Sequence, residues 1–296
     1  MSTVSREVKG NCKYKRTYRA ALAQKKAEGT RRQSKQVKKM DSNPKLLEYV
    51  LKKLVKKKWS PKTIAERLKS SYPEDMTMHI SHESIYTYIY CLARGSFRKE
   101  LIKSLRHERT LRHNRKLPHA RRGAIQDAIS IHERPKETES RTIPGHWEGD
   151  LMMGSKVSNS SLETLVERTT RYTLLVPLKS HDAEIVRIEF AKAIKNIPRG
   201  LKRSLTYDRG SEMAQHKLFT KDTKVQVYFC DPHSPWQRGT NENTNGLLRQ
   251  FFPKGIDFNK VTKKEIMHVQ DLINDRPRKV LAYAKPDEVF LPLLNS

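Results

Sequence analysis

Five short apolar runs, and the helical stretches between them, most constrain the fold of this chain. The runs HWEGDLMMG, LETLVERT and YTLLVPL follow one another closely, as the strands of a meander do. The next segment, HDAEIVRIEFAKAIKNIP, spaces its apolar residues as a helix does, and the runs SLTYD and VQVYF flank the helical SEMAQHKLFT. This order predicts an α/β domain over residues 144–296, with helices packed on a mixed sheet and a further helix at about 237–251.

Basic residues dominate the first half of the chain. The sequence has 60 Lys and Arg against 32 Asp and Glu, a formal net charge of +28. Residues 1–140 contribute +21 of this charge, and residues 141–296 contribute +7. Because so large an excess repels itself unless a polyanion neutralises it, double-stranded DNA is the expected partner of the first half. The second half has the charge balance of an ordinary globular domain.

Neither a membrane partner nor export is expected. No apolar run approaches the ~18 residues of a membrane span, and the segment MSTVSREVKG lacks the apolar core of a signal peptide. The three cysteines, Cys12, Cys91 and Cys230, are odd in number and scattered, so they are expected to be reduced thiols without a disulfide framework. A cytoplasmic protein is therefore predicted.

Residues 41–94 are predicted to fold as an all-α helix-turn-helix domain. The segment NPKLLEYVLKKLVKKKW has an apolar stripe at helical spacing, and the segments SPKTIAERL and SHESIYTYIY each begin with a Ser suited to cap a helix. The third helix has polar side chains free to enter a DNA groove, namely those of His82, Ser84 and Thr87. The alternative is a small helical bundle without a role in DNA binding.

Two basic segments flank this domain. Residues 1–40 have no sustained apolar period and are predicted to form a basic arm on DNA, the alternative being a tail without a partner. Residues 95–143 are predicted to form a basic connector, in which Arg121 and Arg122 are candidate phosphate contacts. The alternative for this second segment is a solvated linker.

Three carboxylates from three separate elements are the candidate catalytic residues. Asp150 lies near the end of the first predicted strand and Asp208 at the end of the fourth, and sites in open α/β sheets gather at the carboxyl ends of strands. Glu242 lies on the helix after the last strand. Arg238 and Arg249 share its helical face and are candidate DNA contacts.

Converging carboxylates repel one another and require a cation. Hard oxygen ligands select Mg²⁺, for which Mn²⁺ can substitute, and such ions can activate a water or a 3′-hydroxyl and stabilise the leaving oxygen of a phosphodiester. The spacing leaves other interpretations open. A single Asp after a strand is commonly a turn or capping residue, and Glu148, on the same side of its strand as Asp150, is a competing ligand.

The chain as a whole resembles the DDE transposases of bacterial insertion sequences, in particular the insertion-sequence-thirty family. The resemblance rests on blocks spread over nearly the whole chain, among them SREVKG, ISHESIYTYIY, RPKETESRTIPGHWEGDLMMG, LTYDRGSEMAQHKLFT, VYFCDPHSPWQRGTNENTNGLLRQFFPKG and INDRPRKVLAYAKPDEVF. It implies an RNase H-like catalytic domain whose acidic triad maps to Asp150, Asp208 and Glu242. The 33 residues between the last two match the spacing of the family. Glu148 then becomes a carboxylate behind the site or a spare charge.

The resemblance also implies an activity and a mode of binding. We expect a homo-oligomer that binds the terminal inverted repeats of its insertion sequence, cuts one DNA strand at each end with Mg²⁺, and joins the freed 3′-hydroxyl to target DNA. One alternative is a catalytically decayed DNA-binding protein that represses the element. Another is a structure-directed nuclease on the same fold.

The first residues depart from the family pattern. In the family, STVSREVK resembles the recognition helix of a first helix-turn-helix, so this chain is expected to be N-terminally truncated within that module. Residues 1–9 are predicted to be frayed or weakly helical, because isolated helices shorter than ~12–15 residues are marginal in water.

Overall fold

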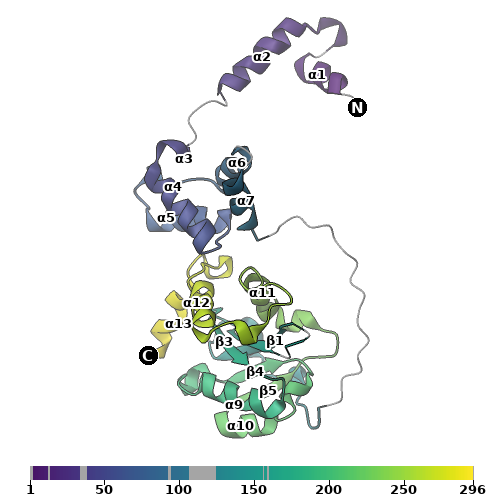
Figure 1. Cartoon of the computed structure of the whole chain (residues 1–296), viewed down its shortest axis with the longest axis vertical. Coiled ribbons are helices and arrows are strands. Elements are labelled where there is room, and N and C mark those ends of the chain that lie inside the picture. Colours follow the sequence, from purple (N-terminus) through teal and green to yellow (C-terminus); the bar gives the residue numbers. More distant parts are fainter. Residues whose placement is uncertain are drawn as a thin grey trace.

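The structure is a computed structural model, and it describes residues 3–12, 14–33, 39–92, 95–106, 125–155, 157–158 and 160–295. A helical N-terminal part and an α/β C-terminal part follow one another along the long axis of the molecule (Figure 1). The helical part holds the predicted DNA-binding elements, and the α/β part holds the predicted catalytic carboxylates.

The first helix is better formed than the sequence predicts. α1 spans Thr3–Asn11, and α2 spans Ala20–Gln33. The hydroxyl of Tyr18, between the two helices, donates a hydrogen bond to Glu7 Oε1 at 2.6 Å. The sequence predicts a frayed or weakly helical segment at residues 1–9, whereas its described residues form a regular helix that Tyr18 contacts.

Five helices form the compact section of the N-terminal part, namely α3 (Lys39–Ser42), α4 (Pro44–Leu51), α5 (Pro61–Ser71), α6 (His82–Cys91) and α7 (Ser96–Lys103). α4 continues as a π-helical segment over Lys52–Lys56. The side chains of Asn43, Ser60 and Ser81 accept backbone N–H hydrogen bonds in the first turns of α4, α5 and α6. The two Ser caps expected from the sequence are thus confirmed.

An apolar cluster holds these helices together. Its most deeply buried members are Leu46, Val50, Leu54, Ile64, Leu68 and Ile85. Leu101 of α7 and Leu105, which follows it, are buried in the same cluster. The sequence predicts only a basic connector here, so α7 is an element that sequence reasoning missed. Its apolar pair at i and i+4 was the available signal.

A five-stranded mixed sheet forms the centre of the C-terminal part, in the order β3-β2-β1-β4-β5. Its strands are β1 (His146–Met153), β2 (Ser161–Glu167), β3 (Thr173–Leu178), β4 (Ser204–Tyr207) and β5 (Gln226–Phe229). The first three pair antiparallel as a meander, whereas β4 runs parallel to β1 and β5 runs parallel to β4. All five predicted strands are present, and the predicted mixed α/β, RNase H-like fold class is confirmed.

Helices cover both faces of this sheet (Figure 1). They are α9 (Ala183–Ile194) and α10 (His216–Thr223) on one face and α11 (Gly239–Leu248) and α12 (Lys263–Asn274) on the other, with the short α8 (Glu137–Ser140) and α13 (Pro286–Phe290). Trp147 of β1 packs in the cluster formed with α9, whereas Met152 packs in the cluster formed with α11 and α12. Since side chains alternate along a strand, Glu148 and Asp150 share the face of Met152 and point towards α11.

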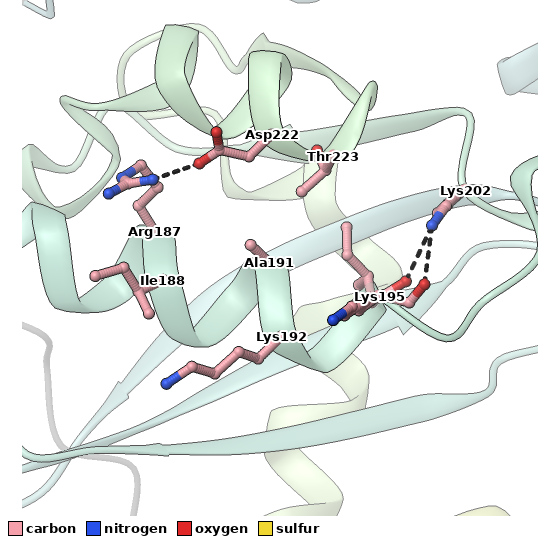
Figure 2. Close-up of a pocket in the computed structure, with 9 residues that line it drawn as sticks. Arg187, Ile188, Ala191, Lys192, Lys195, Lys202, Asp222 and Thr223 are labelled. Atoms are coloured by element: carbon pink, nitrogen blue, oxygen red, sulfur yellow. Dashed lines mark hydrogen bonds and ion pairs between the residues drawn. The ribbon is translucent and has the colours of Figure 1, made fainter.

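A groove of about 380 Å³ lies between α9 and α10 (Figure 2). Arg187 on its wall is paired with Asp222, and Lys202 Nζ donates hydrogen bonds to the backbone oxygens of Ile194 and Lys195 at 3.4 and 3.2 Å. These cations are already bound to groups of the protein. None of the predicted site residues lines the groove, because the predicted site lies on the α11 face of the sheet.

Polar contacts join the helical part to the C-terminal part. Arg67 of α5 forms an ion pair with Glu288 of α13, and Lys57 Nζ lies 3.2 Å from a carboxylate oxygen of Asp275, just after α12. These contacts place α5 and the end of α4 over the α12–α13 end of the α/β part.

The membrane and the cysteines can also be examined in the structure. Within the described ranges, no helix combines the length and the apolar character that crossing a lipid bilayer requires. The three cysteines carry free thiols. Cys230 is buried, and burial raises the pKa of its thiol to about 11, so this side chain is a poor nucleophile at neutral pH.

Candidate active site

Asp150 and Asp208 come together because they share a register on two neighbouring parallel strands. His146 of β1 pairs with Ser204 of β4, and Glu148 pairs with Thr206. Continuing that register by two residues sets Asp150 beside Asp208, which directly follows β4. The side chains of the two aspartates are 30% and 26% exposed, so both reach the surface of the α11 face.

The guanidinium of Arg238 lies between these two carboxylates. Its Nη1 donates hydrogen bonds to Asp150 Oδ1 at 2.5 Å and to the backbone oxygen of Gly149 at 2.8 Å. Its Nη2 donates to Asp208 Oδ2 at 3.1 Å. Asn245 Nδ2 donates to the second oxygen of Asp150 at 2.6 Å. One cation thus joins the two aspartates, and an amide fixes the orientation of the first.

Burial and charge act in opposite directions in this cluster. Burial raises the pKa of Asp150, and the adjacent Arg238 opposes that effect without cancelling it. Burial also disfavours the charged form of Arg238, but Asp150 and Asp208 outweigh it and raise the pKa of the guanidinium. The two carboxylates therefore form a site that favours a cation, and their hard oxygen atoms suit a divalent metal.

Glu242 lies on α11, one turn beyond Arg238, which ends the 3₁₀ segment Pro235–Arg238. Its side chain is exposed. In the described part of the chain, no three His, Cys, Asp or Glu side chains lie close enough together to hold a metal ion. The structure thus brings together two of the three predicted acids and places the third on the adjacent helix, so the complete triad stays a prediction.

Glu148 is buried and anchors the first turn of α11. Its Oε2 accepts a hydrogen bond from the backbone N–H of Asn241 at 2.9 Å, and its Oε1 lies 3.6 Å from Arg168 Nε. Asn241 in turn donates its side-chain amide to the backbone oxygens of Glu148 and Thr164 at 3.2 and 3.0 Å. Glu148 therefore ties the strand of Asp150 to the helix of Glu242, and the partners Asn241, Thr164 and Arg168 were missed by sequence reasoning.

Replacing Glu148 with Gln is expected to lower the free energy of unfolding by roughly 1–3 kcal/mol, because the buried Arg168 loses the carboxylate that lies 3.6 Å from its Nε. DNA cleavage by the folded variant should fall less than in variants of the predicted triad. Chemical denaturation followed by circular dichroism measures the first effect. An unchanged unfolding midpoint would show that this buried carboxylate does not hold α11 in place.

A second buried carboxylate lies close behind Asp150. Glu163 of β2 is fully buried, accepts a hydrogen bond from Tyr207 Oη at 2.9 Å, and has one oxygen without a partner. Burial, with a further contribution from Asp150, raises the pKa of Glu163 well above its usual range. Gly149 leaves room for this arrangement, since a Cβ there would lie 2.6 Å from the ring of Tyr207. The acid in the run LETLVE was the available signal for this residue.

The predicted DNA contacts lie in different settings. Ser84 and Thr87 are exposed on α6, and His82 is half-buried at its start. Arg249 is half-buried and donates to the backbone oxygens of Met153 and Phe252 at 3.3 and 3.4 Å, so it joins the ends of α11 and β1. The pair Arg121 and Arg122 lies outside the described residues.

Comparison with known proteins defines the class to which this fold and site belong. Residues 142–235 match the family of the integrase core domain. This match covers all five strands together with Asp150 and Asp208, and it implies a metal-dependent, nuclease-like enzyme.

Relatives of the whole chain narrow the class further. The chain is 42% identical over 293 residues to the transposase for insertion sequence element IS1086 of Cupriavidus metallidurans, an alignment that covers 99% of this chain and 86% of the relative. It is 42% identical over 292 residues to transposase InsI for insertion sequence element IS30A of Escherichia coli, covering 98% and 75%. A transposase for insertion sequence element IS4351 of Bacteroides fragilis is 36% identical over 295 residues, covering 99% and 87%. The chain belongs to the IS30 family of insertion-sequence transposases.

Proposed function

We propose that this transposase binds the terminal inverted repeats of its own element, cuts one strand at each end, and joins the 3′-hydroxyl to target DNA. The observation that carries the proposal is the meeting of Asp150 and Asp208 on one cation, directly beside the helix of Glu242. The family match and the relatives support the same chemistry.

Asp150, Asp208 and Glu242 are proposed as the ligands of Mg²⁺, with Mn²⁺ as a substitute. The bound ion supplies Lewis-acid polarisation of the phosphodiester and a more acidic attacking hydroxyl. Asn245 keeps one oxygen of Asp150 oriented, through its 2.6 Å hydrogen bond. Arg238 and Arg249 are proposed to contact phosphates of the bound strand on the same helical face.

The helical part is proposed to recognise the element ends. In this division of the chain, residues 1–40 are a basic arm, residues 41–94 a helix-turn-helix domain, residues 95–143 a basic connector and residues 144–296 the catalytic domain. The exposed positions on α6 fit a helix that reads bases, and Arg121 and Arg122 are proposed phosphate contacts. We further propose that the protein acts as a homo-oligomer on DNA in the bacterial cytoplasm.

Incubation with end-bearing DNA tests this function. With Mg²⁺, the purified chain is expected to nick duplexes that carry the element ends and to join them covalently to a second duplex. Random-sequence duplexes and reactions with chelator are the controls. Sequence-specific binding without cleavage under any divalent metal would contradict the proposed activity.

Thr87→Ala on α6 is expected to weaken binding to the element ends by roughly tenfold, as expected for the loss of a base contact worth ~1–3 kcal/mol, while binding to random DNA changes little. Competition binding with end DNA against random DNA measures this ratio. Lys62→Gln, an exposed substitution on α5, is the control that should weaken both kinds of binding alike. An unchanged ratio for Thr87→Ala together with His82→Ala would exclude α6 as the base-reading helix.

A further inference from the structure

Four arginines gather on one flank of α11, away from the predicted catalytic site. They come from three places in the chain: Arg106 follows α7, Arg171 lies between β2 and β3, and Arg276 and Arg278 follow α12. Burial and mutual repulsion lower the pKa of Arg276 to about 10 and that of Arg278 to about 9. The charges that act on Arg278 are those of the other three, so the four guanidinium groups form one electrostatic cluster, which we call the arginine cluster.

Two of these arginines contact one face of α11, and a third contacts a residue just beyond its end. Arg106 Nη2 donates to Asn243 Oδ1 at 2.8 Å, and Arg171 Nη1 donates to Thr240 Oγ1 at 2.6 Å. Arg276 Nη1 donates to Gln250 Oε1 at 2.8 Å, just beyond the end of the helix. At about 100° per residue, positions 240 and 243 lie about 60° apart around α11, whereas position 242 lies about 100–160° from them. α11 thus separates the arginine cluster from the predicted catalytic face.

No carboxylate of the described residues lies within ion-pair distance of the arginine cluster, and only Arg171 is influenced by the more distant charges of Glu148 and Glu167. The hydrogen bonds of the cluster go to two amide oxygens, a hydroxyl and a backbone oxygen, which are neutral acceptors. Arg276 and Arg278 are only 5% and 7% exposed, and the buried Nε atoms of Arg171 and Arg278 have no acceptor in the described part of the chain. Burying like charges in this way is costly unless an anion joins them.

Other arginines of the chain show that carboxylates are available where the fold uses them. Arg67 is paired with Glu288, Arg187 with Asp222, and Arg238 with Asp150. The arginine cluster differs from these pairs, because it brings four planar donors together with no carboxylate of the described residues within ion-pair distance. Planar guanidinium donors of this kind match the oxygen atoms of a phosphate.

We propose that the arginine cluster is a second DNA-backbone site, which holds phosphates of the strand that crosses α11 from the catalytic face. The inference rests on the proposed function, since the path of the strand begins at Glu242. A helix with its side chains is ~10–12 Å across, and successive phosphates of one strand advance ~3.4 Å along the axis of a duplex. A duplex whose axis crosses α11 therefore places the site about three nucleotides from the reacting phosphate. Because Arg106 belongs to the helical part, a phosphate bound here also links that part to the catalytic domain.

The double variant Arg106→Gln/Arg171→Gln tests the proposal without altering the two most buried arginines. Binding to a short random-sequence duplex is measured without divalent metal at a series of salt concentrations. Each lost phosphate contact lowers the slope of log affinity against log salt by about 0.9, so the slope should fall by about 1–2. The Lys variant Arg106→Lys/Arg171→Lys keeps the charge and should retain most of the slope.

The control Lys179→Gln/Arg199→Gln removes the same charge from exposed positions away from α11 and should leave the slope unchanged. An equal fall in slope for the control and the cluster variant would overturn the proposal. The proposal would also be overturned if the cluster variant kept its slope but showed reduced self-association in sedimentation. The anion bound by the arginine cluster would then be an acidic segment of a second copy of the chain. The two proposals can be told apart. If the wild-type chain cleaves element ends but the cluster variant keeps the salt slope of the wild type, this inference is refuted and the proposed function stands.

Discussion

Asp150→Asn, Asp208→Asn and Glu242→Gln are each expected to reduce DNA cleavage and strand transfer at least ~10³-fold. Each substitution keeps the shape of the side chain and removes the negative charge of a proposed metal ligand. A loss of about 4 kcal/mol of transition-state stabilisation corresponds to this factor, at 1.36 kcal/mol for each tenfold change in rate. The measurement is cleavage of end-bearing DNA with Mg²⁺ under single-turnover conditions.

DNA binding by the same three variants should persist. In Asp150→Asn and Asp208→Asn, Arg238 loses part of the negative charge that now holds it, so binding in the absence of metal should be unchanged or tighter. Glu184→Gln, an exposed substitution in the first turn of α9, is the matched control and should cleave normally. Full activity in any triad variant would remove that residue from the site, and loss of binding would point to misfolding instead.

Raising the salt concentration from 50 to 200 mM is expected to weaken DNA binding by the full chain roughly 10³–10⁵-fold. This range follows if 6–10 phosphates are neutralised, because each contact releases counterions from the DNA. A fragment of residues 1–140 should keep most of the dependence, since it carries +21 of the +28 net charge. Fluorescence anisotropy with a labelled duplex gives both slopes, and a flat response from the fragment would exclude the basic half as the main DNA contact.

The strands could be predicted from the sequence because their side chains alternate and their turns are marked. The same reasoning placed Asp150 near the end of the first strand and Asp208 at the end of the fourth. β1 runs on to Met153, but the shared register of the two parallel strands still brings these aspartates together. The pairing of Arg238 with both acids was not predictable, since it depends on where a helix after the last strand meets the sheet. Its position on the helical face of Glu242 suggested a DNA contact instead.

Elements that depend on distant partners were the ones missed. α12 carries Ile266, Val269 and Ile273 at helical spacing, so a helix could have been predicted here from the sequence. Its packing against β3 could not. The arginines after it looked like part of a family block, and only the fold shows that Arg106, far away in the chain, joins them. α1 shows the opposite limit, since a helix too short to persist alone is contacted by Tyr18, in a segment predicted only as a basic arm.

The bond between Glu148 and the first turn of α11 has a mechanical consequence. Asn241, the residue directly before Glu242, is hydrogen-bonded to Glu148 of β1. A rotation of α11 about this fixed point would therefore move Glu242 very little. Tilting α11 by a few degrees would displace Arg249 at its far end while leaving the backbone of Glu242 almost stationary. In the proposed triad, Glu242 would therefore approach the two aspartates by rotation of its own side chain, whereas a tilt of α11 would displace mainly the end that carries Arg249.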